Sequence, residues 1–121
     1  KNVCFNIIYY ICANLPCPMC RGHAMIYLNN NSIRRCNTKE EFKYYLWQFH
    51  NNVNIRLGKP VFTKEKLDEL YSRCNFYKIC LLFIKEFKRP YYYGRSMSSW
   101  QRKNVSNDIR VYLINNWKYF V

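Results

Sequence analysis

Glycine and proline are scarce in this chain, with 3 and 4 residues among 121. Such low contents exclude a collagen-like, low-complexity or loop-rich chain, because those classes depend on these two residue types. No stretch shows the alternation of apolar and polar residues that a half-buried strand requires. These absences favour helices joined by short connections, in a chain long enough to form one packed core.

Long hydrophobic runs are missing as well. The longest without tyrosine covers only residues 79–84, whereas a membrane-spanning helix needs roughly 18 apolar residues. Half of the residues are nonetheless hydrophobic, with tyrosine and cysteine included in the count. The sequence therefore predicts a core-forming chain with no membrane span.

Acidic residues are also few. Seven Asp and Glu stand against twenty Lys and Arg, which gives a formal net charge of +13. This excess is typical of proteins that meet nucleic acid, an acidic membrane surface or an anionic ligand. It is equally compatible with a solvated basic surface that keeps a small protein in solution.

Apolar residues recur at helical spacing along most of the chain. The pattern predicts five helical segments, at residues 2–14, about 16–28, 38–57, 63–71 with a continuation after Asn75 to residue 88, and 105–117. Thr38 and Glu41 form a capping-box pattern at the start of the third segment. Gly58, followed by Lys-Pro, marks its end. With a loop at residues 91–99, the predicted fold class is all-α.

The apolar stripes of two segments indicate which faces are buried. The third segment carries Phe42, Leu46, Phe49, Val53 and Leu57, and the last carries Ile109, Tyr112, Leu113 and Trp117. Residues spaced by three or four positions lie on one helix face. Both segments are therefore predicted to pack one side against a core.

Cysteine, unlike glycine, is abundant, and its count of seven is odd. Cys17 and Cys20 lie two residues apart at the predicted start of a helix. The first-turn N–H groups and the helix dipole favour a thiolate there, so a redox-active pair is one interpretation. A zinc site that also uses His23, or a plain structural bridge, are alternatives that these residues leave open.

His50 and Asn54 are four residues apart on the third predicted helix and therefore share a face beside its apolar stripe. Asparagine is a poor former of helix interiors, because its side chain competes for backbone hydrogen bonds. Three asparagines at residues 51, 52 and 54 therefore indicate either a binding site, where polar groups find partners, or a solvated helix face with a histidine in the core.

Residues 15–24 read Leu-Pro-Cys-Pro-Met-Cys-Arg-Gly-His-Ala, and residues 50–62 read His-Asn-Asn-Val-Asn-Ile-Arg-Leu-Gly-Lys-Pro-Val-Phe. A Cys-x-x-Cys followed by this second run resembles the Erv/ALR family of FAD-linked sulfhydryl oxidases. The sequence around the cysteines is most similar to that of the short viral members, of poxvirus, African swine fever virus and baculovirus type. The resemblance covers about residues 3–71.

The resemblance implies a four- or five-helix bundle of the Erv/ALR type. Residues 1–75 would form the FAD-binding sulfhydryl oxidase core, and residues 76–121 a basic, aromatic-rich helical extension. The family's first helix, which carries a Trp and a His that contacts the flavin, has no counterpart in these 121 residues. We therefore expect the parent protein to have that helix upstream of residue 1.

The resemblance also implies roles for individual residues. Cys20 would lie against the flavin, and Cys17 would be the outer sulfur that an incoming thiolate attacks. Lys59 would lie by the FAD phosphates and Phe62 near the adenine. The full set of implied FAD-binding residues is His50, Asn51, Val53, Asn54, Lys59, Phe62 and Tyr71.

The implied function is that of an enzyme, an FAD-linked thiol oxidase that forms disulfide bonds in protein thiols. Electrons would pass from the Cys-x-x-Cys pair to the flavin and then to O2, giving H2O2. Its partners would be protein thiols, among them a thioredoxin-like or viral relay protein, and a second copy in a homodimer. Nucleic acid is not expected as a partner, and the expected location is the host cytoplasm or the virion of a large DNA virus.

Two other function classes stay open. One is a basic binding module, with zinc on Cys17, Cys20 and His23. Its tail would hold nucleic acid through Tyr91, Tyr92, Tyr93, Arg95, Trp100, Arg102 and Lys103. The other is a catalytically degenerate oxidase scaffold used in virion assembly.

Cys74 and Cys80 raise a separate question, whether they relay electrons to Cys17 as a shuttle pair. Two residues six apart in one continuous helix point to nearly opposite faces and cannot form a disulfide. A shuttle pair would therefore require a helix break near Asn75. The alternative is that these cysteines, like Cys4, Cys12 and Cys36, are buried for structural reasons.

Overall fold

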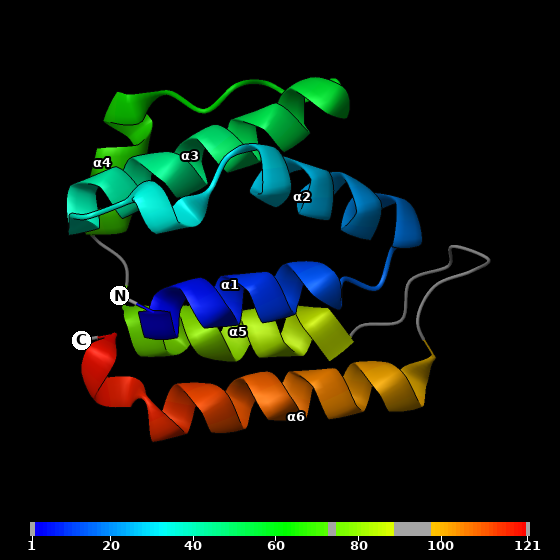
Figure 1. The fold of residues 1–121 in the computed structure, drawn as a ribbon. Helices are drawn as coiled ribbons and strands as arrows, with labels where there is room; N and C mark the ends of the chain where they lie inside the picture. The colour runs from blue at the N-terminus through cyan, green and yellow to red at the C-terminus, as the bar shows by residue number, and fades with distance from the viewer. Residues whose placement is uncertain (1, 73–74, 89–97, 121) are drawn as a thin grey trace. The chain divides into compact units, whose positions relative to one another are not determined.

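The computed structural model describes residues 2–72, 75–88 and 98–120, except for the side chains of residues 71, 76 and 88. Its helices are α1 (Asn2–Ala13), α2 (Pro18–Asn30), α3 (Lys39–Arg56), α4 (Lys64–Ser72), α5 (Phe76–Lys88) and α6 (Ser99–Asn115) (Figure 1). Short 3-10 helices span Ile33–Arg35 and Trp117–Tyr119. These described residues contain no strand, so the all-α prediction is confirmed. Within the same residues, no helix is both long and apolar enough to cross a membrane.

The ends of α3 follow the predicted signals. The Thr38 hydroxyl accepts a hydrogen bond from the Glu41 N–H at 3.1 Å, and the Glu41 carboxylate accepts one from the Thr38 N–H at 3.2 Å. At the other end Gly58 has φ +70°, a left-handed conformation that glycine adopts without a steric cost. The Lys59 N–H then donates to the Asn54 carbonyl at 2.8 Å, which closes the helix.

Helix α6 begins at Ser99, six residues before the predicted start at Val105, so that boundary was wrong. The cause is a second capping box. The Ser98 hydroxyl accepts from the Gln101 N–H, and the Gln101 side-chain oxygen accepts from the Ser98 N–H, both at 3.1 Å. The Ser-x-x-Gln pattern is visible in the sequence and is the signal that would have found this start. Most of the predicted loop at residues 91–99 lies outside the described residues.

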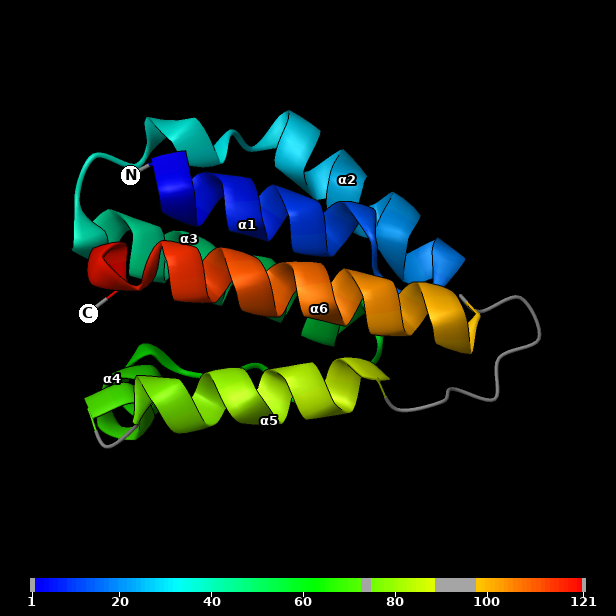
Figure 2. The same ribbon diagram turned by 90° about the horizontal axis from the view of Figure 1, so that it is seen from below.

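The chain divides into two compact units, which do not follow chain order. Residues 1–31 and 76–121 form the first, and residues 32–75 form the second. In the first unit α6 packs against both α1 and α5, and α1 also packs against α2 (Figures 1 and 2). Its core holds Ile7, Phe87, Val105 and Ile109. The C-terminal segment is therefore an integral part of this unit.

In the second unit α4 returns beside the first half of α3 (Figure 1). The Lys43 ammonium joins the two helices through a contact of 2.7 Å with the Asp68 carboxylate. Among its described residues, the buried hydrophobic ones are Ile33, Cys36, Tyr45 and Leu67. The predicted stripe of α3 is half-buried from Phe42 to Val53, whereas Leu57 is exposed, because α3 ends one residue before it.

A tyrosine–carboxylate contact joins α1 to α6. The Tyr10 hydroxyl donates to the Asp108 carboxylate at 2.8 Å. Desolvation by burial, with the hydrogen bond and the negative charge of Asp108 adding to it, raises the pKa of Tyr10 to about 12. The folded protein therefore holds this proton at a pH where the unfolded chain, with an ordinary tyrosine pKa near 10, has released it.

This difference makes a prediction for stability at alkaline pH. The contribution of Tyr10 is complete below about pH 10 and is lost as the pH rises from 10 to 12, since the unfolded chain binds fewer protons there. We expect the urea midpoint of the wild type to fall across this range more steeply than that of Tyr10→Phe. Equal slopes for the two proteins would contradict the assignment.

Candidate functional site

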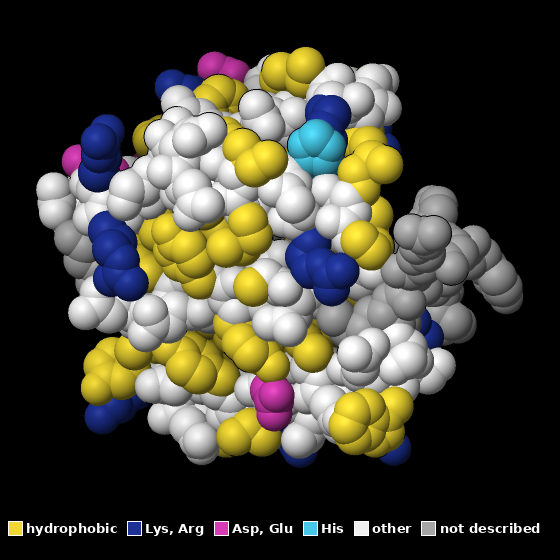
Figure 3. Space-filling view, turned by 45° about the vertical axis from the view of Figure 1, so that its right-hand side comes forward, with side chains coloured by type: hydrophobic (Ala, Val, Ile, Leu, Met, Phe, Trp, Pro, Cys, Tyr) yellow, Lys and Arg dark blue, Asp and Glu magenta, His cyan; other side chains and the backbone are white. Residues whose placement is uncertain are grey.

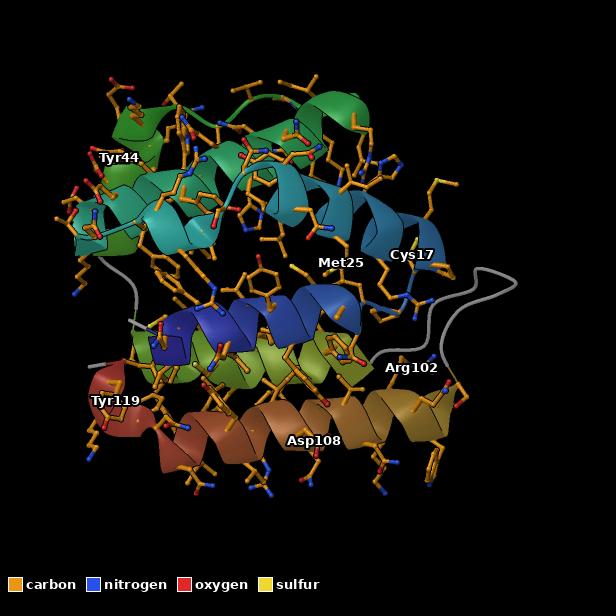
Figure 4. All side chains as sticks on the ribbon, in the orientation of Figure 1. Cys17, Met25, Tyr44, Arg102, Asp108 and Tyr119 are labelled. Carbon is orange, nitrogen blue, oxygen red and sulfur yellow. The ribbon has the colours of Figure 1, made fainter. Side chains whose placement is uncertain are left out.

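The first candidate group lies where α2 begins. Cys17 is the N-cap residue, with extended backbone (φ −87°, ψ 116°), and its sulfur accepts a hydrogen bond from the Cys20 N–H at 3.3 Å (Figure 4). Pro18 occupies the first turn, where the missing N–H is not needed. Both cysteines are half-buried. An N–H donor and a helix N-terminus both stabilise a thiolate on Cys17.

The surroundings of this pair are open. Met19, between the two cysteines, is 72% exposed, and Pro18 is exposed as well. His23, three residues after Cys20, is also exposed. These exposed neighbours place the turn that carries the two sulfurs at the surface of its own compact unit, as far as the described residues define it.

The second candidate group lies in the other compact unit, on the last turns of α3. His50 is exposed, and its ring makes an edge contact with that of Phe49 at 6.4 Å between centroids. Partial desolvation by surrounding protein atoms lowers the pKa of His50, which favours a neutral imidazole at neutral pH. Val53 and Asn54 are half-buried on the following turn.

Asn51 differs from its neighbours because its side chain is only 7% exposed. Its amide oxygen accepts from the Phe62 N–H at 2.8 Å, and its amide nitrogen donates to the Phe62 carbonyl at 2.9 Å. Asn54 donates to the same Asn51 oxygen at 3.4 Å. The structure therefore brings three predicted residues together: Asn51, Asn54 and Phe62.

The remaining predicted residues of this group lie on the segment after α3 and on α4. Lys59 is exposed on the segment between α3 and α4, where Phe62 is half-buried. Tyr71 belongs to α4, but its side chain lies outside the described part of the chain. The segment thus presents a cation and an aromatic ring next to the polar end of α3.

Trp47 was not singled out from the sequence. Its indole N–H donates to the Phe62 carbonyl at 2.6 Å. Trp47 and Asn51 are four residues apart and so share a helix face, which is the signal that could have paired them. Their common partner, Phe62, could not have been found in this way, because it lies eleven residues beyond Asn51.

The binding-module alternative finds little support. Within the described ranges there is no cluster of three His, Cys, Asp or Glu side chains able to hold a metal. Arg102, expected on a nucleic-acid surface, is only 4% exposed and donates to the Ser99 hydroxyl at 3.1 Å. Residues 91–93 and Arg95 lie outside the described residues, whereas Trp100 is 73% exposed.

Basic side chains are scattered over the face shown in Figure 3. They occur singly or in small groups, with apolar and neutral side chains between them. Small groups of this kind are compatible with the solvated basic surface that the sequence left open as one explanation of the charge.

Comparisons with known proteins place these motifs in context. Residues 1–72 match the sequence model of the Erv1 / Alr family. The FAD-linked sulfhydryl oxidase of African swine fever virus (isolate Pig/Kenya/KEN-50/1950) is 42% identical over 60 residues, 50% of each chain. The probable FAD-linked sulfhydryl oxidase of variola virus is 36% identical over 52 residues, 43% of this chain and 55% of the viral one. This chain thus spans about half the length of the curated relatives it matches, and no solved structure matches it.

Proposed function

Because the chain belongs to the Erv1/Alr family, we propose that it is part of an FAD-linked sulfhydryl oxidase that forms disulfide bonds in protein thiols. The family motifs predicted this membership, and the matches to viral oxidases support the activity. The observation that carries the proposal is the Cys17–Cys20 turn, where the Cys17 sulfur is the cap of a helix N-terminus and accepts a hydrogen bond from the Cys20 N–H. Both features favour the thiolate form of a cysteine.

The residues of α3 and its exit fit the proposed cofactor chemically. A dinucleotide site needs apolar and aromatic walls, a few hydrogen-bond donors and a cation for the pyrophosphate. His50, Val53 and Asn54 supply the first two on α3, and Phe62 and Lys59 supply a ring and a cation beyond it. Asn51 and Tyr71 complete the proposed set.

Bound FAD would supply the two-electron acceptor that returns the cysteine pair to its disulfide, with O2, reduced to H2O2, as the final acceptor. His50, with its pKa lowered, would meet the cofactor as a neutral hydrogen-bonding group. Lys59 would neutralise part of the charge on the pyrophosphate. His50 and Lys59 would bind and orient the cofactor, whereas the two cysteines carry out the thiol–disulfide exchange.

The exchange itself takes place on the cysteine pair. A substrate thiolate attacks the Cys17 sulfur of the disulfide, so that a mixed disulfide forms and Cys20 leaves as a thiolate. A second substrate thiolate then attacks the substrate sulfur, which yields the substrate disulfide and releases Cys17 as a thiolate. Two substrate thiols are oxidised, and one protein disulfide is reduced to two thiols. The Cys20 N–H assists the second step, because it stabilises the departing Cys17 thiolate.

The substrate and setting follow from the same proposal. We expect protein thiols as substrates, delivered directly or through a thioredoxin-like relay protein, and a homodimer as the working form. The relatives named above are viral. We therefore propose that the chain comes from a large DNA virus and acts in the host cytoplasm or the virion.

Purification tests the proposal. We expect a yellow protein with a flavin absorbance spectrum, which consumes O2 and produces H2O2 when a reduced protein or dithiothreitol is added. A colourless protein that takes up no added FAD and holds stoichiometric zinc would instead support the binding-module alternative. A yellow protein without thiol-dependent O2 consumption would indicate a degenerate scaffold.

A further inference from the structure

The backbone of Phe62 is held by two side chains from one face of α3. The Asn51 amide bonds both its N–H, at 2.8 Å, and its carbonyl, at 2.9 Å. The Trp47 indole N–H donates to the same carbonyl at 2.6 Å. A carbonyl oxygen accepts two hydrogen bonds. The hydrogen-bonding capacity of this residue's backbone is therefore filled by side chains.

Burial increases the strength of these contacts. Asn51 is 7% exposed, and hydrogen bonds are stronger where water does not compete for them. The outer side of Trp47 is covered by the Lys64 ammonium, which lies 5.3 Å from the indole and 5.0 Å from the Tyr44 ring. A cation over two aromatic faces adds a modest attraction. Lys64, the first residue of α4, thus covers the Trp47 side of the contact with Phe62.

The segment that contains Phe62 has no regular secondary structure. After Gly58 turns the chain, residues 59–63 are neither helix nor strand, and all of them except Phe62 are exposed. The Lys59 N–H is held at one end by the Asn54 carbonyl at 2.8 Å. Phe62 is held at the other end by Trp47 and Asn51. The position of both residues relative to α3 is fixed by these attachments.

We propose that Trp47 and Asn51 are positioning residues for the FAD site. They hold the segment at residues 58–63 so that Lys59 and Phe62 face the dinucleotide in one arrangement. This inference rests on the proposed function, because those two residues are placed in the FAD site by the family motif. It gives Asn51 a role through Phe62 rather than through its own contact with the cofactor.

Two substitutions test this with little change in shape. Asn51→Asp keeps the size of the side chain but replaces the donor to the Phe62 carbonyl with an oxygen. Trp47→Phe keeps an aromatic ring but removes the indole N–H. Asn52→Asp is the matched control for the first, since Asn52 is the neighbouring residue on α3 and is exposed. Trp100→Phe, at a position 73% exposed, is the control for the second.

The first measurement is the FAD dissociation constant, from quenching of flavin fluorescence during titration of the apoprotein. We expect it to rise about 10- to 100-fold in Asn51→Asp and in Trp47→Phe, because a lost buried hydrogen bond weakens a site by this order. At saturating FAD, kcat of Trp47→Phe should return to within about twofold of the wild type, because Trp47 does not exchange thiols. The two controls should bind FAD like the wild type.

The second measurement needs no cofactor. Exchange of the Phe62 amide hydrogen in the apoprotein should be at least about tenfold faster in both variants. Each variant loses a donor to the Phe62 carbonyl, so the segment opens more often and the Phe62 N–H leaves its acceptor on residue 51 more often. Wild-type affinity in two folded variants would overturn the inference while leaving the proposed function intact. If one variant fails to fold, the other decides. A wild type that binds no FAD would overturn the proposed function and the inference together.

Discussion

Replacing Cys17 or Cys20 by serine is expected to lower thiol-dependent O2 consumption roughly a thousandfold or more, the effect typical of removing an essential nucleophile. A serine oxygen cannot form a disulfide, so neither variant can complete the exchange on this pair. Both variants should still bind FAD, because serine is close in size to cysteine and the proposed FAD-binding residues lie on α3, on the segment that follows it and on α4. The measurement is O2 uptake with dithiothreitol and with a reduced protein as substrate.

The two variants also distinguish the roles of the two sulfurs. In Cys20→Ser the remaining Cys17 thiolate should attack the disulfide of an oxidised protein substrate, and the second substrate sulfur then leaves as a thiolate. The resulting mixed disulfide should persist, because no Cys20 remains to displace the substrate, and mass spectrometry detects it. If the mixed disulfide instead forms on Cys20 in Cys17→Ser, the order of the two sulfurs is reversed. Activity that survives in either variant would contradict the proposed exchange.

Cys80→Ser and Cys4→Ser serve as controls, and the first also tests the shuttle-pair hypothesis. The helix break that such a pair requires is present, because α5 begins only at Phe76. Burial, however, raises the pKa of Cys80, which lowers its thiolate fraction and makes it a poor nucleophile at neutral pH. Cys74 lies outside the described residues. We therefore expect unchanged turnover in Cys80→Ser, and a large loss with protein substrates alone would favour the shuttle.

The second large effect concerns stability. Ile109→Ala is expected to lower the free energy of unfolding by about 2–5 kcal/mol, the usual range for an isoleucine truncated in a core. Ile109 is only 1% exposed and belongs to the cluster with Ile7, Phe87 and Val105. Domains are stable by about 5–15 kcal/mol in total, so this single change should remove a large part of the stability. Urea unfolding followed by circular dichroism measures it.

The matched control is Ile114→Ala on the same helix. Ile114 is 60% exposed, and surface substitutions usually change stability by less than about 0.5 kcal/mol. Equal losses in the two variants would contradict the role of core packing, since both changes raise the helix propensity of α6 and only Ile109 is buried. A small effect of Ile109→Ala would contradict the packing of α6 against α1.

Local signals in the sequence were sufficient for most of the helices. Thr38 with Glu41 and Gly58 mark the ends of α3 because capping depends on residues a few positions apart. Ser98 with Gln101 carries the same information for α6, but the apolar pattern alone pointed to Val105. The stripe of α6 was located correctly, since Ile109 is buried and Tyr112 and Leu113 pack beside it.

Contacts between distant segments were beyond the reach of local patterns. From the sequence, the hydrogen-bond partner of the Asn51 side chain was expected to be either a ligand or solvent. In the structure this partner is the backbone of Phe62. Backbone groups are the same in every residue, so no side-chain pattern marks which one an amide will bond. Arg102 is a similar case. A charged residue is expected at the surface unless it is paired, but Arg102 is buried and donates to the Ser99 hydroxyl.

The candidate site shows the same contrast. The Cys17–Cys20 pair and the run from His50 to Phe62 were recognised as motifs because their spacing is local. The role of residues 76–121 had no such motif, yet Phe87, Val105 and Ile109 supply most of the buried cluster around Ile7. The predicted division of the chain after residue 75 stays a prediction. If residues 1–75 are the family core, that core needs residues 76–121 as a packing partner for α1.

The hydrogen bond from the Cys20 N–H to the Cys17 sulfur has a thermodynamic consequence. A sulfur in a disulfide carries no negative charge, so it accepts this bond more weakly than a thiolate does. The first turn of α2 is consequently held more firmly after the pair has taken up electrons than before. Whatever free energy that turn gains on reduction makes the pair a stronger oxidant by the same amount, so the winding of this helix and the oxidising power of its sulfurs are coupled quantities.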